Sequence, residues 1–196
     1  MPSMNKHQQR FLRAVALPPS LGIDIGRVII NAADPSGRAD TSFLSGSEQA
    51  ALETPASAGA FEAIADLVTA FDGRVWLVSK CGPRIQRLTL RWLLRQRFYE
   101  LTGVRQDRVR FCLKRPEKRG HCLAIGATHF VDDRLDVLEH LVDAVPHLYW
   151  FGHQSQTSAS SAVTWAERTL DWPAARRAIL SQLRARSSGS ELAHGP

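Results

Sequence analysis

The sequence predicts an α/β fold, a Rossmann-like doubly wound parallel sheet with helices on both faces. Short apolar runs typical of buried strands alternate with longer stretches whose apolar residues recur at helical spacing. Three of the apolar runs end in a polar side chain, at Asp24, Ser79 and Asp132, and ligands of such sheets bind at the carboxyl ends of the strands. At 196 residues with 44% apolar composition, the chain can bury one sizeable core, which favours one domain with appendages.

The N-terminal part combines an appendage, the first strand and an insertion. Apolar residues on one side of residues 5–17 predict a helix that a Pro-Pro pair ends, so we assign residues 1–19 to a helical appendage. The apolar run from Leu21 predicts the first strand. The sequence then turns small and polar and contains turn signals such as the DPSG run, which predicts a flap or short insertion near 31–56.

Helices and strands alternate from residue 58 onward. Apolar spacings of three and four predict a first helix that the Asp72-Gly73 turn ends, and Pro116 opens a later one. The predicted helices span residues 58–71, 84–98, 117–125 and 134–142. The predicted strands span residues 74–79, 109–113, 128–131 and 147–151.

A polar linker and one more helix follow the last strand. Residues rich in Ser, Gln and Thr extend from Gly152 to about Ser161. A helix is predicted at residues 172–184, and the polar tail after it is expected to be mobile. We therefore assign residues 20–153 to the core and residues 154–196 to a linker, a C-terminal helix and a mobile tail.

Charge, cysteine content and hydropathy restrict the class of protein. The 25 Lys and Arg residues exceed the 19 Asp and Glu residues, and the charge of +6 favours an anionic partner, a phosphorylated small molecule foremost or else nucleic acid. Three cysteines at spacings that match no zinc site indicate reduced thiols. Because no apolar run approaches the roughly 18 residues of a membrane span and the N-terminus lacks a signal peptide's apolar block, we expect a cytoplasmic protein without a membrane partner.

Two acidic strand ends are the main functional signal. Asp24 lies in the run LGIDIGRVII where a strand enters a glycine turn, and the Asp132-Asp133 pair ends the run THFV. Packing explains the first carboxylate poorly, and two strand-end carboxylates suggest one shared cation. The structural alternatives are a turn or helix-cap role for Asp24 and an N-cap role for the Asp132-Asp133 pair at the helix that starts near Arg134.

Taken together with a serine and a lysine, these residues resemble the haloacid dehalogenase-like (HAD) superfamily of phosphotransferases over residues 21–151. The family carries, in fixed order, a strand ending in Asp-x-Asp-x-Thr/Val, a strand ending in Ser or Thr, a Lys, and a strand ending in Asp-Asp. The matching positions are DIGRV at 24–28, VWLVS at 75–79, Lys118, and FVDD at 130–133. Because little sequence separates the first two motifs, the resemblance implies a small or absent cap and an open site.

The resemblance implies a Mg²⁺-dependent phosphohydrolase. Attack of a carboxylate on an anionic phosphate ester requires that the charge repulsion be cancelled, and a Mg²⁺ held by oxygen ligands does this. By resemblance, Asp24 is the nucleophile that forms an aspartyl-phosphate and is also a metal ligand. The backbone carbonyl of Gly26 and the carboxylate of Asp132 complete the metal site, and Asp133 is a water-mediated ligand or orienter. Gly26 is assigned to substrate binding as well.

The resemblance also assigns the other phosphate-binding residues. Ser79 is expected to hydrogen-bond a phosphoryl oxygen, and Lys118 to neutralise charge on the phosphate and on Asp24. Lys114 is a rival for the position of the motif lysine. We favour Lys118, because Pro116 starts a helix whose first turn carries Lys118 toward the strand ends.

Gly26 departs from the family pattern. Family phosphatases place a second Asp here as general acid and base, and such groups supply about 10² to 10⁴ in rate, or roughly 3 to 5 kcal/mol. Either the leaving group needs no acid, or His153 or a residue of the insertion supplies the proton, or the site binds phosphate without turnover. The alternative function is therefore a catalytically weakened phosphate-binding or regulatory protein. Dehalogenation also lacks this Asp but needs no metal, so the Asp132-Asp133 pair counts against it.

Other side chains have structural interpretations. Cys81 is expected to be an inert thiol and His129 to pack in the core. Four arginines share one face of the helix predicted at 84–98 and suggest a nucleic-acid end-processing role, but a solvated face is favoured because no aromatic platform accompanies them. These arginines are Arg84, Arg87, Arg91 and Arg95.

Overall fold

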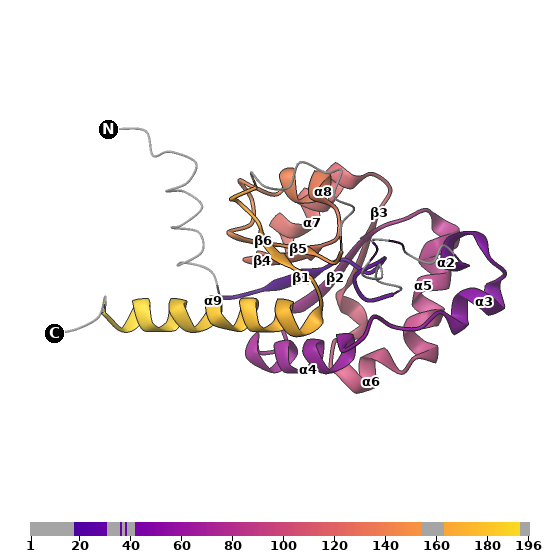
Figure 1. Ribbon diagram of the computed structural model, residues 1–196, viewed down its shortest axis with the longest axis horizontal. Helices are drawn as coiled ribbons and strands as arrows, with labels where there is room; N and C mark the ends of the chain where they lie inside the picture. Colours follow the sequence, from indigo (N-terminus) through magenta and orange to yellow (C-terminus); the bar gives the residue numbers. More distant parts are fainter. Residues whose placement is uncertain (1–17, 31–35, 37, 39–41, 154–162, 193–196) are drawn as a thin grey trace.

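The described strands of the computed structural model form one six-stranded parallel sheet in the order β3-β2-β1-β4-β5-β6 (Figure 1). This confirms the predicted Rossmann-like α/β fold. The order reverses between β1 and β4, and ligands of such sheets bind at this switch point. The strands are β1 (Leu21–Ile23), β2 (Val75–Lys80), β3 (Val109–Cys112), β4 (His129–Asp132), β5 (His147–Phe151) and β6 (Glu167–Thr169).

The structure describes residues 18–30, 36, 38, 42–153 and 163–192. The predicted N-terminal helix at 5–17, most of residues 31–41 and the linker at 154–162 lie outside the described residues.

Helices cover both faces of the sheet (Figure 1). One face carries α4 (Ala60–Ala70), α5 (Pro83–Arg95), α6 (Phe98–Thr102) and α9 (Trp172–Leu192). The other face carries α7 (Lys118–Ala124) and α8 (Leu135–Glu139). The short helices α2 (Ser42–Ser45) and α3 (Glu48–Glu53) follow β1, and the 3-10 turns η1 (Gln106–Arg108) and η2 (Arg115–Glu117) flank β3. Among the described residues, no helix combines the length and the apolar character that crossing a membrane requires.

Side chains of the strands alternate between two cores, because successive residues of a strand point to opposite faces. Leu77 packs in the core with α4 and α5, whereas Val78 packs in the core with α7 and α8. On β4, Val131 packs in the core with α4 and α5, and Phe130 packs in the core with α7 and α8. The ring of Phe130 lies so close to Gly22 of β1 that a Cβ there would come within 2.4 Å of a ring carbon, so only glycine fits.

The insertion after β1 packs against the core where it is described. Trp92 Nε1 donates to the Thr54 carbonyl at 2.8 Å, and Gln96 Nε2 donates to the Leu52 carbonyl at 3.2 Å. Phe43 of α2 is buried in the same core. Residues 42–53 thus form two short helices attached to the body of the domain beside α5 (Figure 1).

Several element boundaries differ from the prediction. The helix predicted at 84–98 is divided into α5 and α6 at Arg97, whose φ of 53° does not occur within a right-handed helix. The pattern does not predict β6, since only Thr169 of this short strand is buried. The C-terminal helix predicted at 172–184 is longer in the structure, where α9 continues to Leu192.

Candidate active site

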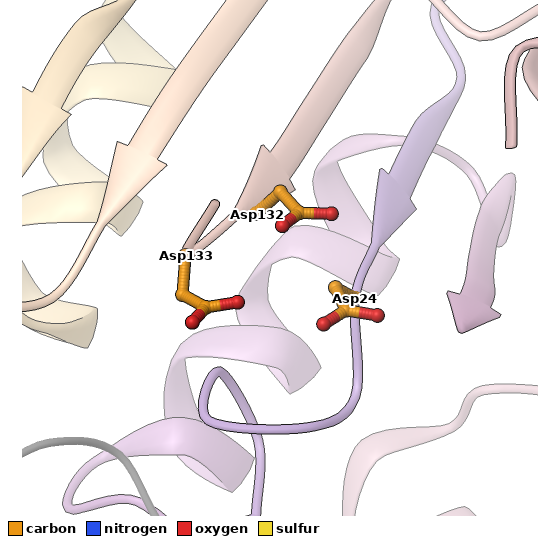
Figure 2. Close-up of side chains that lie close together, drawn as sticks. All are labelled: Asp24, Asp132 and Asp133. Atoms are coloured by element: carbon orange, nitrogen blue, oxygen red, sulfur yellow. The ribbon is translucent and has the colours of Figure 1, made fainter. Parts of the chain in front are cut away.

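The neighbouring strands β1 and β4 place two carboxylates side by side at the switch point of the sheet. Ile23 of β1 pairs with Val131 of β4, so the next residues, Asp24 and Asp132, lie side by side at the carboxyl ends of their strands. The Asp24 N–H donates to the Val131 carbonyl at 2.9 Å, which extends this register beyond the end of β1. Figure 2 shows the carboxylates of Asp24, Asp132 and Asp133 directed toward one another. Their ligand oxygens lie within 4.8 Å of one another.

Lys118 joins the two strand-end carboxylates. Its Nζ donates to Asp24 Oδ1 and to Asp132 Oδ2, each at 2.7 Å, and its side chain is only 3% exposed. Lys118 is the first residue of α7, and its Nζ also lies 5.7 Å from the centroid of the Phe130 ring. Lys114, which lies before the 3-10 turn η2, is exposed. The lysine that contacts the carboxylates is therefore Lys118 and not Lys114.

A tight turn after β1 brings a second cation to the cluster. The Arg27 N–H donates to the Ile30 carbonyl at 2.7 Å, and the Ile30 N–H donates to the Ile25 carbonyl at 3.0 Å. Arg27 adopts a φ of 59°, in the left-handed region that costs an L-residue roughly 1–2 kcal/mol. Its guanidinium pairs with Asp133 at 2.9 Å while its side chain stays 46% exposed. Sequence reasoning misses this role because no periodic pattern marks the turn geometry that directs Arg27 to Asp133.

Negative charge exceeds positive charge in this cluster. Among the residues that the structure describes, three carboxylates lie around one buried ammonium and one half-exposed guanidinium. Burial, reinforced by the Asp24 carboxylate, raises the pKa of Asp132 to about 7 and the pKa of Asp133 to about 6. Burial on its own lowers the pKa of Lys118, but attraction by Asp24 and Asp132 outweighs it and raises that pKa above the ordinary lysine value. The oxygen donors and the deficit of positive charge suit a divalent cation.

The Asp132-Asp133 pair does not cap the following helix. The N-cap residue of α8 is Arg134, and its side chain makes no capping hydrogen bond. Asp132 Oδ1 accepts the Arg134 backbone N–H at 2.9 Å, while its Oδ2 accepts from Lys118. Both oxygens of Asp132 are therefore held in place, which fixes the carboxylate toward the cluster.

Ser79 and Gly26 lie near the same edge of the sheet. Ser79 stands near the carboxyl end of β2, the strand beside β1, and is 7% exposed. Gly26 is exposed in the turn after Asp24, and a Cβ on it would meet no atom within 4 Å. The roles of these two residues in phosphate and metal binding stay predictions.

His129 and Cys81 occupy structural positions, as predicted. His129 starts β4, at the opposite end of the strand from Asp132, and its Nδ1 lies 2.8 Å from Thr128 Oγ1. Its ring meets Phe71 edge-on with centroids 5.1 Å apart. Burial raises the pKa of Cys81 to about 11, so this thiol stays protonated at neutral pH and is a poor nucleophile.

Two of the four arginines on one face of α5 contact residues of the insertion. Arg84 Nη1 donates to the Leu44 carbonyl at 3.2 Å, and Arg91 pairs with Glu48. Both contacts give these arginines a structural role in holding α2 and α3 against α5.

No known protein-family model matches the chain, and no curated protein matches it at significant similarity.

Replacing Lys118 by Met is expected to lower the free energy of unfolding by about 3–5 kcal/mol near neutral pH without Mg²⁺, because two buried carboxylates then lose their cation. Urea unfolding measures the change. Lys114→Met, the same substitution at a nearby exposed lysine, is expected to change the free energy of unfolding by less than about 0.5 kcal/mol. Equal effects of the two substitutions would contradict the importance of the buried ion pairs.

Mg²⁺ is expected to stabilise the protein more at about pH 8 than at about pH 5. The pKa values of about 7 for Asp132 and about 6 for Asp133 lie above the ordinary Asp value of 3.8, so at intermediate pH the folded protein holds protons that the unfolded chain has released. In EDTA these two groups therefore reduce stability as pH rises from about 4 to about 7, and a cation bound to the ionised carboxylates offsets this loss.

Thermal unfolding with Mg²⁺ and with EDTA at both pH values measures this difference. Asp132→Asn is the control that is expected to lose most of the Mg²⁺-dependent shift in melting temperature. A shift of the same size at both pH values in the unsubstituted protein would contradict the assignment of these carboxylates as metal ligands.

Proposed function

We propose that this chain is a Mg²⁺-dependent phosphohydrolase of the HAD-like type, which cleaves a phosphate ester through an aspartyl-phosphate on Asp24. The observation that carries the proposal is the contact of one buried lysine, Lys118, with both Asp24 and Asp132 at the switch point of a parallel sheet. Asp133 adds a third carboxylate, and Ser79 lies near the carboxyl end of the adjoining strand. These are the motif positions of the sequence resemblance, and they come from four separate segments of the chain.

The acidic cluster suits a magnesium ion. Asp24, Asp132 and Asp133 offer carboxylate oxygens within 4.8 Å of one another, and oxygen is the ligand that Mg²⁺ prefers. The Asp132 side chain is fully buried, and burying a carboxylate without adequate compensation is costly. These three residues would hold the ion, with the Gly26 carbonyl as a further ligand. When bound, Mg²⁺ supplies charge neutralisation and orientation of the phosphoryl group.

The contacts of Asp24 support its role as nucleophile. Lys118 holds Oδ1, which fixes the carboxylate and leaves Oδ2 as the attacking atom. Oδ2 forms a bond to phosphorus, the bond from phosphorus to the leaving oxygen breaks, and the leaving oxygen keeps the electron pair. Lys118 and Ser79 stabilise negative charge on the phosphoryl oxygens. Water then attacks phosphorus, and the Asp24 carboxylate departs as inorganic phosphate is released.

Gly26 favours a second candidate function. The position two residues after the nucleophile carries no side chain, so the described site has no carboxylate there to protonate a leaving group or to activate water. The alternative is a regulatory protein that binds Mg²⁺ and phosphate with little or no turnover. Binding of both without hydrolysis of any phosphate ester in a broad panel would favour this alternative, whereas efficient turnover of one ester would exclude it.

Asp24→Asn is expected to reduce Mg²⁺-dependent hydrolysis of p-nitrophenyl phosphate by more than about 10³-fold, because the amide is not a nucleophile for phosphorus. Release of p-nitrophenol with Mg²⁺ and with EDTA measures the loss. Asp143→Asn is the matched control, since Asp143 is half exposed and pairs with Arg119 away from the cluster. Activity that survives Asp24→Asn would exclude Asp24 as the nucleophile.

Gly26→Asp is expected to raise hydrolysis of an alkyl phosphate such as glycerol 3-phosphate by about 10² to 10⁴, because it restores a general acid. The backbone accepts the change, as a Cβ at this position meets no atom within 4 Å. Release of inorganic phosphate measures the gain, and Gly120→Asp, a second open glycine on α7, is the control. An unchanged rate in Gly26→Asp would mean that the acid is not the missing component.

A further inference from the structure

The described turn after β1, residues 25–30, exposes a cation and no acid. Gly26 and Arg27 are the exposed residues of this turn, whereas Asp24 is buried. Because the carboxylate attacks phosphorus from the buried side, an in-line leaving group departs on the exposed side. Arg27 is the cation that this turn contributes on the exposed side, and its guanidinium pairs with the Asp133 carboxylate at 2.9 Å.

The two cations of the cluster, Arg27 and Lys118, are poor proton donors. A guanidinium keeps its proton in proteins, so Arg27 stabilises negative charge but does not act as a general acid. Lys118 is buried between two carboxylates that hold its protons in place. A leaving oxygen at this site therefore departs without a proton from either cation.

We propose, building on the function proposed above, that the substrates are phosphoanhydrides, in which the group that leaves is itself a phosphate. Such a group departs as a stable anion and needs no general acid. Arginine binds phosphate oxygens through two parallel charge-assisted N–H···O bonds, which is the recognition that Arg27 offers on the exposed side of the site. The half-exposed Arg27 side chain is anchored here by its ion pair with Asp133.

The reaction consumes only the phosphoanhydride and water. Asp24 Oδ2 bonds to the terminal phosphorus, the bond from that phosphorus to the bridging oxygen breaks, and the departing phosphate keeps the electron pair. Water then attacks the phosphorus of the aspartyl-phosphate and the bond to Oδ2 breaks. The Asp24 carboxylate keeps that electron pair, and the proton of the water passes to bulk solvent.

The first test compares donors with good and poor leaving groups. With Mg²⁺, the unsubstituted protein is expected to hydrolyse inorganic pyrophosphate with a kcat/KM at least about 100-fold above that for glycerol 3-phosphate, the lower bound of what a general acid supplies. In Gly26→Asp this ratio is expected to fall toward one, since the acid assists only the poor leaving group. A ratio near one in the unsubstituted protein would overturn the inference.

The second test concerns Arg27. Arg27→Gln is expected to lower kcat/KM for pyrophosphate relative to p-nitrophenyl phosphate by about 10- to 100-fold, because charge-assisted hydrogen bonds to the leaving phosphate are lost. Arg27→Lys keeps the charge but lacks the planar pair of donors. Its ratio of kcat/KM for pyrophosphate to kcat/KM for p-nitrophenyl phosphate is expected to lie between those of the unsubstituted protein and Arg27→Gln. Arg105→Gln is the control, because Arg105 is exposed and pairs with Asp107 outside the cluster. An unchanged ratio in an Arg27→Gln protein with normal thermal stability would overturn the inference.

Failure of this inference is distinguishable from failure of the proposed function. If hydrolysis of p-nitrophenyl phosphate depends on Asp24 but pyrophosphate has no advantage, only the substrate class is wrong. If that hydrolysis is independent of Asp24, the proposed function is wrong. Absence of turnover of all three compounds by both the unsubstituted protein and Gly26→Asp would reject both.

Discussion

The site depends on one buried cation, Lys118, held between Asp24 and Asp132 at the point where the strand order of the sheet reverses. Two neighbouring parallel strands place the carboxylates level with each other, and the first residue of α7 supplies the ammonium. The Phe130 ring that lies near the lysine packs directly against Gly22, where any side chain would collide with it.

Stability alone does not account for this cluster. Well-packed apolar residues often stabilise a core as well as a buried ion pair does, and here three carboxylates share two cations. Burial, reinforced by repulsion from the Asp24 carboxylate, raises the pKa of Asp132 and Asp133. A site of this kind is typical of metal binding and phosphoryl chemistry, where a divalent cation completes the charge balance. Arg27, held in a strained turn at the exposed rim, fits the same interpretation.

The sequence predicts the parts of the fold that follow from hydrophobic periodicity. The strands beginning at Leu21 and His129 are apolar runs, and the rule that ligands bind at strand ends brings Asp24 and Asp132 together before any coordinates are known. Pro116 lies in the 3-10 turn η2 just before α7 rather than in the helix itself, and Lys118, the first residue of α7, is the lysine that contacts the carboxylates. The break at Arg97 and the pairing of Arg27 with Asp133 depend on left-handed backbone conformations, which periodicity does not encode. β6 is missed because a short edge strand buries too little apolar surface to leave a pattern.

We propose that Asp24 accepts a phosphoryl group beside a metal ion held by the same cluster. Beryllium trifluoride mimics a phosphoryl group on a carboxylate, so ¹⁹F NMR of the protein with beryllium fluoride and Mg²⁺ tests this claim directly. We expect bound fluorine resonances that require Mg²⁺ and disappear in Asp24→Asn. Their absence from the unsubstituted protein, or their persistence in Asp24→Asn, would contradict the account.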